Sequence, residues 1–397
     1  MWPEKGKRST RIRRRSTVSC YFQHDCYFQP EIIFEILTRL PPESLVKFMC
    51  VCKDWNSIIR SQKFIRAQHD RSMKANSRTI LVLNSNAPTR SEASLVYFDT
   101  LIPHTVRVKQ PLNKLAGMTS VAGYSNGLVC IMRAGEHLVV WNPSIRRFKQ
   151  IPFEQPAGAG KRYYGFGYDS TDDDYKLVRV VVFGFDGVSS EVKIYSLKSN
   201  SWKKIQGLPR IEDFGMLSLR LSSWNGVLHW LMCHKLDEQT HRLVTLDLAT
   251  ERYDELPIPH YNDGPQLTLG VLGEEYLYVS LHYRPEAESI LNSRNDVWIM
   301  KEYGVATSWT KLYTFALEDM PQTPEYKRLA FKSYRHCKPL LFSETGEKVL
   351  LHVDSDTLYW YDCETKETKR VHINGEPSCY STAIWKGNFL LSDGDPV

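Results

Sequence analysis

The sequence predicts an α+β multidomain chain, in which a small three-helix module precedes an all-β domain shaped like a propeller of about six blades. Apolar residues recur at helical spacing only near the N-terminus, and past residue 76 short alternating or β-branched runs take over. Six similar hairpin segments then follow one another along the chain. With 397 residues, 42% of them hydrophobic, the chain can bury at least one sizeable core.

The helical module is expected to begin at Pro30, which suits a first helical turn because its missing N–H costs nothing there. Apolar residues from Ile32 to Leu40 recur at i, i+3 and i+4, which predicts one apolar face. Pro41 and Pro42 end this helix and can open the next. The second and third helices are predicted from Leu45, Phe48, Met49 and Cys52, and from Trp55, Ile58 and Ile59. About 40 residues cannot bury all these side chains alone, so either the following domain or a partner must cover the rest.

The β domain is predicted from its repeats. Each repeat has a short strand, a polar turn and a second strand, and equivalent points lie 43 to 62 residues apart. This spacing allows about four short strands per repeat, the size of a propeller blade. Strands near residues 383–391 are expected to pair with the first blade and close the ring, although two packed β-sheets are an alternative architecture. The equivalent points are Asp99, Asn142, Ser196, Asp247, Met300 and Asp362.

Residues 30–69 resemble an F-box, the module that docks onto the Skp adaptor of cullin-type ubiquitin ligases. The resemblance rests on Pro30 with its helix, the corner at 39–41, the run at 51–53, and Trp55. Gln29 departs from the family pattern, which usually has a leucine just before the proline. The resemblance implies that eight residues form or support the adaptor-binding surface: Pro30, Ile36, Leu37, Leu40, Pro41, Leu45, Cys52 and Trp55.

The rest of the chain resembles the F-box-associated domain of plant F-box proteins. The phrases at 125–130, 141–144, 164–169, 225–230 and 296–303 carry this resemblance. It extends to the S-locus F-box and F-box/kelch-repeat proteins, although the Gly-Gly pair of kelch repeats and the Trp-Asp pair of WD repeats are missing. The expected organisation is a basic disordered leader at 1–28, an F-box at 29–70, a linker at 71–80 and a substrate-binding β domain at 81–397.

The resemblance implies the substrate-recognition subunit of an SCF-type ubiquitin ligase. Its partners would be a Skp-type adaptor, through it a cullin and a RING subunit, and an unidentified target protein. Such a receptor acts by proximity and needs no catalytic residue of its own. A pollen S-locus factor that recognises a ribonuclease, or an interaction module outside any ligase, are the alternatives. The sequence identifies no substrate-binding residue.

Charge and cysteine usage restrict the other classes. Residues 1–28 hold seven basic and two acidic residues, so most of the net charge of +6 belongs to this leader. The leader is either a nuclear localisation signal or a solvated tail, and nucleic acid is not expected as a partner of the body. No apolar run spans a membrane, no signal peptide is evident, and nine scattered cysteines suggest free thiols, so the cytoplasm, the nucleus or both are expected.

A search for catalytic motifs predicts no enzyme, metal or cofactor. The run Asp172-Asp173-Asp174 lacks the ligand spacing of a calcium loop and is interpreted as a turn. Gly165-Phe166-Gly167 lacks the following helix of a phosphate cradle. His229 is expected to be a satisfied, half-buried strand residue. The basic pairs at 146–147 and 203–204 suit either an acidic or phosphorylated peptide or plain solvation.

Overall fold

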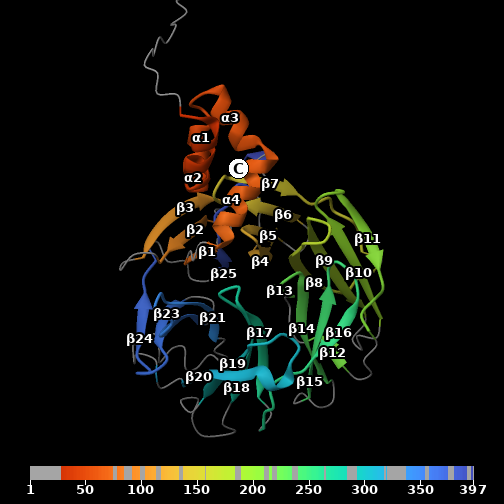
Figure 1. Ribbon diagram of the computed structural model, residues 1–397. Helices are drawn as coiled ribbons and strands as arrows, with labels where there is room; N and C mark the ends of the chain where they lie inside the picture. Colours follow the sequence, from red (N-terminus) through yellow and green to blue (C-terminus); the bar gives the residue numbers. More distant parts are fainter. Residues whose placement is uncertain are drawn as a thin grey trace, which may run out of the picture.

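The computed structural model places four helices beside a ring of β-sheets, in the part of the chain that it describes (Figure 1). The described residues are 28–74, 78–84, 92–98, 103–112, 118–133, 137–156, 158–183, 189–209, 214–216, 221–234, 240–262, 265–283, 293–316, 319, 337–353, 357–373, 380–390 and 395–396. The predicted basic leader therefore lies almost wholly outside them. No helix within these ranges is both long and apolar enough to cross a membrane.

The helical module has one helix more than the sequence predicts. The helices are α1 (Pro30–Thr38), α2 (Pro42–Phe48), α3 (Lys53–Arg60) and α4 (Gln62–Lys74). Because α4 continues to Lys74 and the first strand begins at Thr79, the predicted linker at 71–80 is too long. The polar composition of this segment suggested a linker, but Arg71 and Lys74 suit the negative end of a helix dipole.

The ring consists of six sheets within the described residues, which confirms the propeller and excludes two packed sheets. Neighbouring strands are antiparallel, as in propeller blades. In hydrogen-bonded order, blade 1 contains β25 (Tyr380–Trp385), β1 (Thr79–Asn84), β2 (Glu92–Tyr97) and β3 (His104–Lys109), and blade 2 contains β4 (Thr119–Ser125), β5 (Leu128–Arg133), β6 (His137–Asn142), β7 (Arg147–Gln150) and β26 (Asp395–Pro396). Blade 3 contains β8 (Lys161–Asp169), β9 (Asp174–Phe183), β10 (Ser189–Ser196) and β11 (Ser201–Ile205).

The other three blades follow in chain order. Blade 4 contains β12 (Phe214–Met216), β14 (Val227–His234), β15 (His241–Asp247) and β16 (Tyr253–Leu256), with β13 (Ser222–Trp224) also paired to β14. Blade 5 contains β17 (Gln266–Leu272), β18 (Tyr276–Tyr283), β19 (Arg294–Met300) and β20 (Trp309–Ala316), with the short helix η2 (Ala306–Ser308) before β20. Blade 6 contains β21 (Cys337–Phe342), β22 (Lys348–Val353), β23 (Thr357–Asp362) and β24 (Thr368–Val371).

The ring closes through its last long strand, as the sequence predicts. Strand β25 pairs with β1, with Ala383 opposite Leu81. The strand is shorter than expected, because it ends at Trp385 and residues 386–390 leave the sheet. The repeat alignment is confirmed where the structure describes it, since Asn142, Ser196, Asp247, Met300 and Asp362 each end the third strand of their blade. Asp99, the sixth equivalent point, lies outside the described residues.

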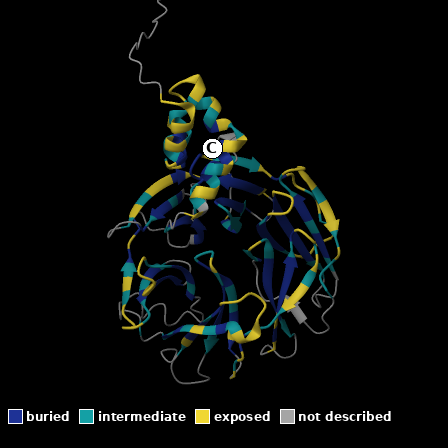
Figure 2. Cartoon of the chain, in the orientation of Figure 1, coloured by how far each residue is buried: buried dark blue, intermediate teal, exposed yellow. Residues whose placement is uncertain are grey.

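Neighbouring blades are held together by side chains that alternate along each strand. In β9, Val178 and Val180 pack towards Trp230 of blade 4, whereas Leu177 packs towards Cys130 of blade 2. This period of two buries both faces of a blade, so the strands show almost continuous burial in Figure 2. The predicted tryptophan core is confirmed at three positions where the ring is fully buried, namely Trp141, Trp230 and Trp385.

Candidate functional site

Helix α1 carries apolar side chains on two opposite faces. Ile33 and Leu37, one turn apart, pack into the core of the helical module. Ile32 and Ile36, also one turn apart, keep 45% and 47% of their surface exposed. The single apolar face predicted for this helix is therefore wrong, because residues at i and i+1 point about 100° apart and cannot all face one side.

Further apolar side chains lie exposed on the same module. Phe28, just before α1, is 58% exposed. Val46 of α2 is 39% exposed, and Val51, between α2 and α3, is 59% exposed. Figure 2 shows the outer sides of these helices as exposed. We call Phe28, Ile32, Ile36, Val46 and Val51 the exposed apolar set, since exposed apolar residues gathered on one small module are typical of protein–protein contact.

The eight residues predicted for the adaptor surface divide into three groups. Only the exposed ones are available for direct contact, and the buried ones can act only by holding the helices in place. Leu37 and Leu45 have 0% exposure and belong to the core. The exposed members are Pro30, Ile36, Pro41 and Cys52, and the half-buried members are Leu40 and Trp55.

Cys52 and Trp55 are joined at the start of α3. The Sγ atom of Cys52 accepts a hydrogen bond from the backbone N–H of Trp55 at 3.5 Å, which caps the helix. The Trp55 ring meets Phe48 edge to face, with ring centroids 5.5 Å apart. These contacts connect α2 to α3, so both residues also stabilise the shape of the predicted surface.

A charged cluster connects α1 to α4 at the surface. Glu35 binds Arg39 at 2.8 Å and Arg71 at 3.2 Å. Hydrogen bonds from Arg39 and then Arg71 lower the pKa of Glu35 below its ordinary value. Because all three side chains are about half exposed, water screens the cluster and it orients the helices more than it stabilises them.

The sequence analysis did not assign Phe28, Ile32, Val46 or Val51 to the predicted surface. Five apolar residues among the nine of α1 are more than one core-facing stripe needs, and this excess is the signal that indicates a second apolar face. Phe28 and Val51 have no comparable signal, since both lie outside helices.

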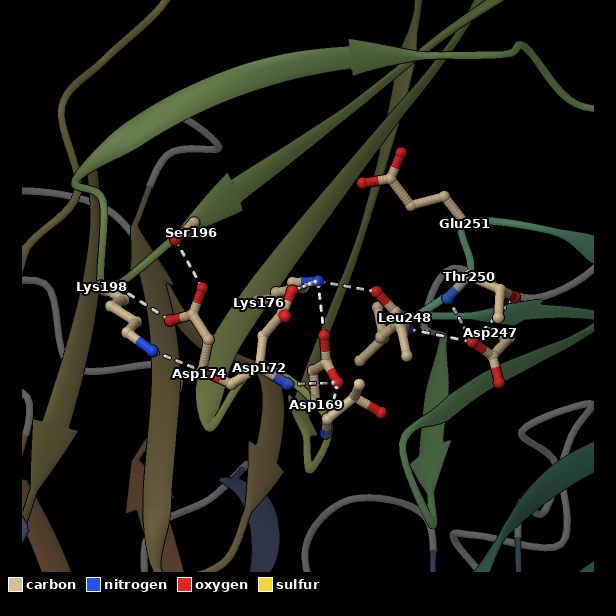
Figure 3. Close-up of polar contacts among 12 residues, drawn as sticks. Asp169, Asp172, Asp174, Lys176, Ser196, Lys198, Asp247, Leu248, Thr250 and Glu251 are labelled. Carbon is tan, nitrogen blue, oxygen red and sulfur yellow. Dashed lines mark hydrogen bonds and ion pairs between the residues drawn. The ribbon is translucent and has the colours of Figure 1, made fainter.

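The acidic run at 172–174 lies at the turn between β8 and β9, as predicted, and its charges are already used (Figure 3). Asp174 accepts from the Ser196 hydroxyl and from the N–H of Lys198. Nearby, the buried Nζ of Lys176 donates to Asp169 at 2.6 Å and to the carbonyl of Leu248 at 2.8 Å. Among the described residues no group of three His, Cys, Asp or Glu side chains could hold a metal ion.

The Asp169–Lys176 pair joins blade 3 to blade 4. Burial alone would raise the pKa of Asp169, but hydrogen bonds from Lys176 and from the N–H groups of Thr171 and Asp172 lower it. The pair is thus charged and buried, with the Leu248 carbonyl of blade 4 as a further acceptor. Its arrangement is that of a structural tie between blades.

Two other predicted positions also have structural explanations. His229 is fully buried, more than predicted, and its ring nitrogens lie 2.9 Å from the Tyr303 hydroxyl and 3.2 Å from the Ser222 carbonyl. Burial lowers its pKa to about 4, so the ring is neutral at pH 7. Gly165 and Gly167 lie in β8 where a Cβ atom would meet Leu221 at 2.6 Å and Ser223 at 2.5 Å, so they permit close blade packing.

Comparisons with known proteins agree with this architecture. The chain matches the F-box domain over residues 29–67 and the F-box associated beta propeller domain over residues 55–388. The F-box protein CPR1 of Arabidopsis thaliana is 31% identical over 387 residues, which cover 91% of this chain and 88% of the relative. An F-box/kelch-repeat protein of the same plant is 28% identical over 304 residues, covering 71% and 78%.

Likeness to solved structures is weaker. The Cps50 (Swd1) β-propeller domain of Myceliophteria thermophila aligns with a TM-score of 0.39 and 11% identity, covering 76% of this chain and 88% of that one. A helical adaptor-type module joined to a six-bladed propeller defines a two-domain interaction protein. The chain belongs to the family of F-box proteins with an F-box-associated β-propeller domain.

Proposed function

We propose that this chain is the substrate-recognition subunit of an SCF-type ubiquitin ligase. The observation that supports this most directly is the two-faced helix α1. Its Ile33 and Leu37 side chains pack into the core, while Ile32 and Ile36 lie exposed in the segment that matches the F-box domain. A small module holds apolar side chains in water when a partner covers them.

The mechanism follows from position alone. The exposed apolar set would bind a Skp-type adaptor, and through it a cullin and a RING subunit. The propeller would hold a target close to the ubiquitin-carrying enzyme, which raises the effective concentration of target lysines. This chain would therefore act as a non-catalytic receptor.

We assign target binding to the end of the propeller away from the helices. The helices contact blade 2 at the β6–β7 turn and blade 3 at the β8–β9 turn, where the connecting turns are short. Connections at the opposite strand ends are longer, with 20 residues between β20 and β21 and ten between β7 and β8. Met118 and Phe153 lie in such connections, on either side of blade 2, and are 63% and 58% exposed. Long surface connections on a rigid scaffold commonly carry binding residues.

Reconstitution tests the ligase role. The purified chain is mixed with a plant Skp-type adaptor, a cullin, a RING subunit and the ubiquitin-transfer enzymes, and ubiquitin chains formed on the receptor itself are measured. We expect modification that is lost with Ile32→Asp plus Ile36→Asp and retained with Val305→Asp, an exposed propeller position. Adaptor binding without modification would favour an interaction module outside any ligase.

The self-incompatibility alternative makes a different prediction about the target. A pollen S-locus factor would bind a ribonuclease through the propeller, and Met118→Glu plus Phe153→Glu would abolish that binding while leaving adaptor binding intact. The proposed site of action is the cytoplasm, the nucleus or both. A fluorescent fusion, compared with one lacking residues 1–28, tests whether the leader directs the chain to the nucleus.

A further inference from the structure

The five residues that follow β25 complete the core of the helical module. Phe389 is 1% exposed and belongs to the same cluster as Leu37, Leu45 and Phe64 of the helices. Ile145, from the β6–β7 turn of blade 2, enters that cluster as well. The F-box helices thus do not close their core alone, and the propeller supplies two of its buried side chains. We call residues 386–390 the clasp.

Buried hydrogen bonds hold the clasp on the side of the helices. Gln68 of α4 is 2% exposed, and its Oε1 atom accepts from the backbone N–H of Phe389 at 3.0 Å. Its Nε2 atom donates to the Ser72 hydroxyl at 2.9 Å, which fixes the orientation of the amide. A polar side chain this deeply buried is stable only while its partner is in place, so Gln68 depends on the clasp.

A second set of hydrogen bonds holds the clasp to blade 2. Asn142 and Asn388 are both fully buried. The Nδ2 atom of Asn142 donates to the carbonyls of Asn388 at 3.1 Å and Leu390 at 2.8 Å, and Asn388 Nδ2 donates to the carbonyl of Asn126. The clasp is therefore tied to the third strand of blade 2 and to the β4–β5 turn at once.

The space for the clasp is closely fitted. A Cβ atom on Gly127, whose φ is +74°, would lie 2.1 Å from Asn388 Nδ2 and 2.2 Å from the Lys386 carbonyl. A Cβ atom on Gly387 would lie 3.1 Å from Ser144 Oγ of blade 2 and 3.5 Å from Pro42 Cγ of α2. The clasp thus touches both domains over its length, and no other chain segment can occupy this space.

We propose that the clasp joins the F-box and the propeller into one cooperative unit, so that residues near the C-terminus determine the integrity of the adaptor-facing helices. Domains joined only by a linker rotate relative to each other unless a large apolar contact prevents it. Here the shared core, the buried amides and the Arg66–Asp173 contact at 3.1 Å provide that contact. The orientation of the helices relative to the propeller is then a fixed property of the fold.

Hydrogen exchange of the full chain tests this proposal. Phe389→Ala should speed exchange of the slowest amides in α1 and α4 by about 100-fold or more, because it empties a buried aromatic site in their core. The matched control is Phe315→Ala in β20, a phenylalanine that is 2% exposed in blade 5. It should affect blade 5 and leave α1 and α4 nearly unchanged, and Phe389→Leu should restore most of the protection.

A milder variant keeps the test decisive if Phe389→Ala fails to fold. Gln68→Leu removes only the acceptor for the Phe389 N–H and should speed exchange of the clasp and of α1 together. Unchanged exchange in α1 after either clasp-site change, or an equal effect of Phe315→Ala, would overturn the proposal. Because the readout needs no adaptor, it stands or fails independently of the proposed ligase role.

Discussion

Two adjacent residues of α1, Ile36 and Leu37, are expected to separate the stability of the helical module from its binding. Leu37 is 0% exposed within the shared core, so Leu37→Ala loses transfer energy and leaves a cavity, at a cost of about 3 kcal/mol. Ile36 keeps 47% of its surface exposed. Full burial of an isoleucine contributes about 1.5–3 kcal/mol, so Ile36→Ala should cost about 1 kcal/mol.

Amide exchange resolved along the chain measures this difference. Leu37→Ala should raise exchange in the helices by about 100-fold and Ile36→Ala by about fivefold, from the relation between free energy and population. Both variants introduce alanine into the same helix turn, so helix propensity is matched. Equal effects of the two changes would refute the conclusion that α1 has one buried and one exposed apolar face.

Three further predictions concern the propeller. Lowering the pH from 7 to 4 should destabilise the fold by up to about 3 kcal/mol through His229, because the unfolded ring binds a proton near 6.5 and the folded ring only near 4, and urea unfolding of His229→Gln should show less of this loss. Lys176→Met should cost about 3 kcal/mol by leaving the Asp169 carboxylate buried and unpaired, whereas adding Asp169→Asn should recover much of it; additive costs in calorimetry would contradict this. Gly127→Ala should lower the urea midpoint more than Gly346→Ala, which has the same left-handed backbone with open space around it.

The propeller was predictable because its determinants are local and repeated. Each blade shows period-two burial and a tight turn at nearly constant spacing, and the predicted equivalent points fall at the same place in five described blades. The closing strand was predictable as well, since a ring with an unpaired inner edge exposes backbone donors and acceptors. Its end was not, because nothing in residues 386–390 indicates that they pack against helices more than 300 residues earlier.

The adaptor surface was predictable only in part. Resemblance identified the segment, but it did not divide Leu37 and Leu45, which are buried, from Ile36, which is exposed. That division depends on which helix face meets α4 and the clasp, and these contacts are long-range. A pattern of one helix counts apolar residues but does not say which of two apolar faces a tertiary neighbour will cover.

Adaptor binding by the full chain tests the central claim most directly. We expect the wild-type chain to bind a plant Skp-type adaptor with a submicromolar dissociation constant, and Ile32→Asp plus Ile36→Asp to weaken binding by about 30-fold or more, since central apolar contacts carry most interface energy. Val305→Asp, an equally drastic change at an exposed propeller residue, should leave binding unchanged. Absence of wild-type binding at tens of micromolar, or equal loss in the control, would contradict the account.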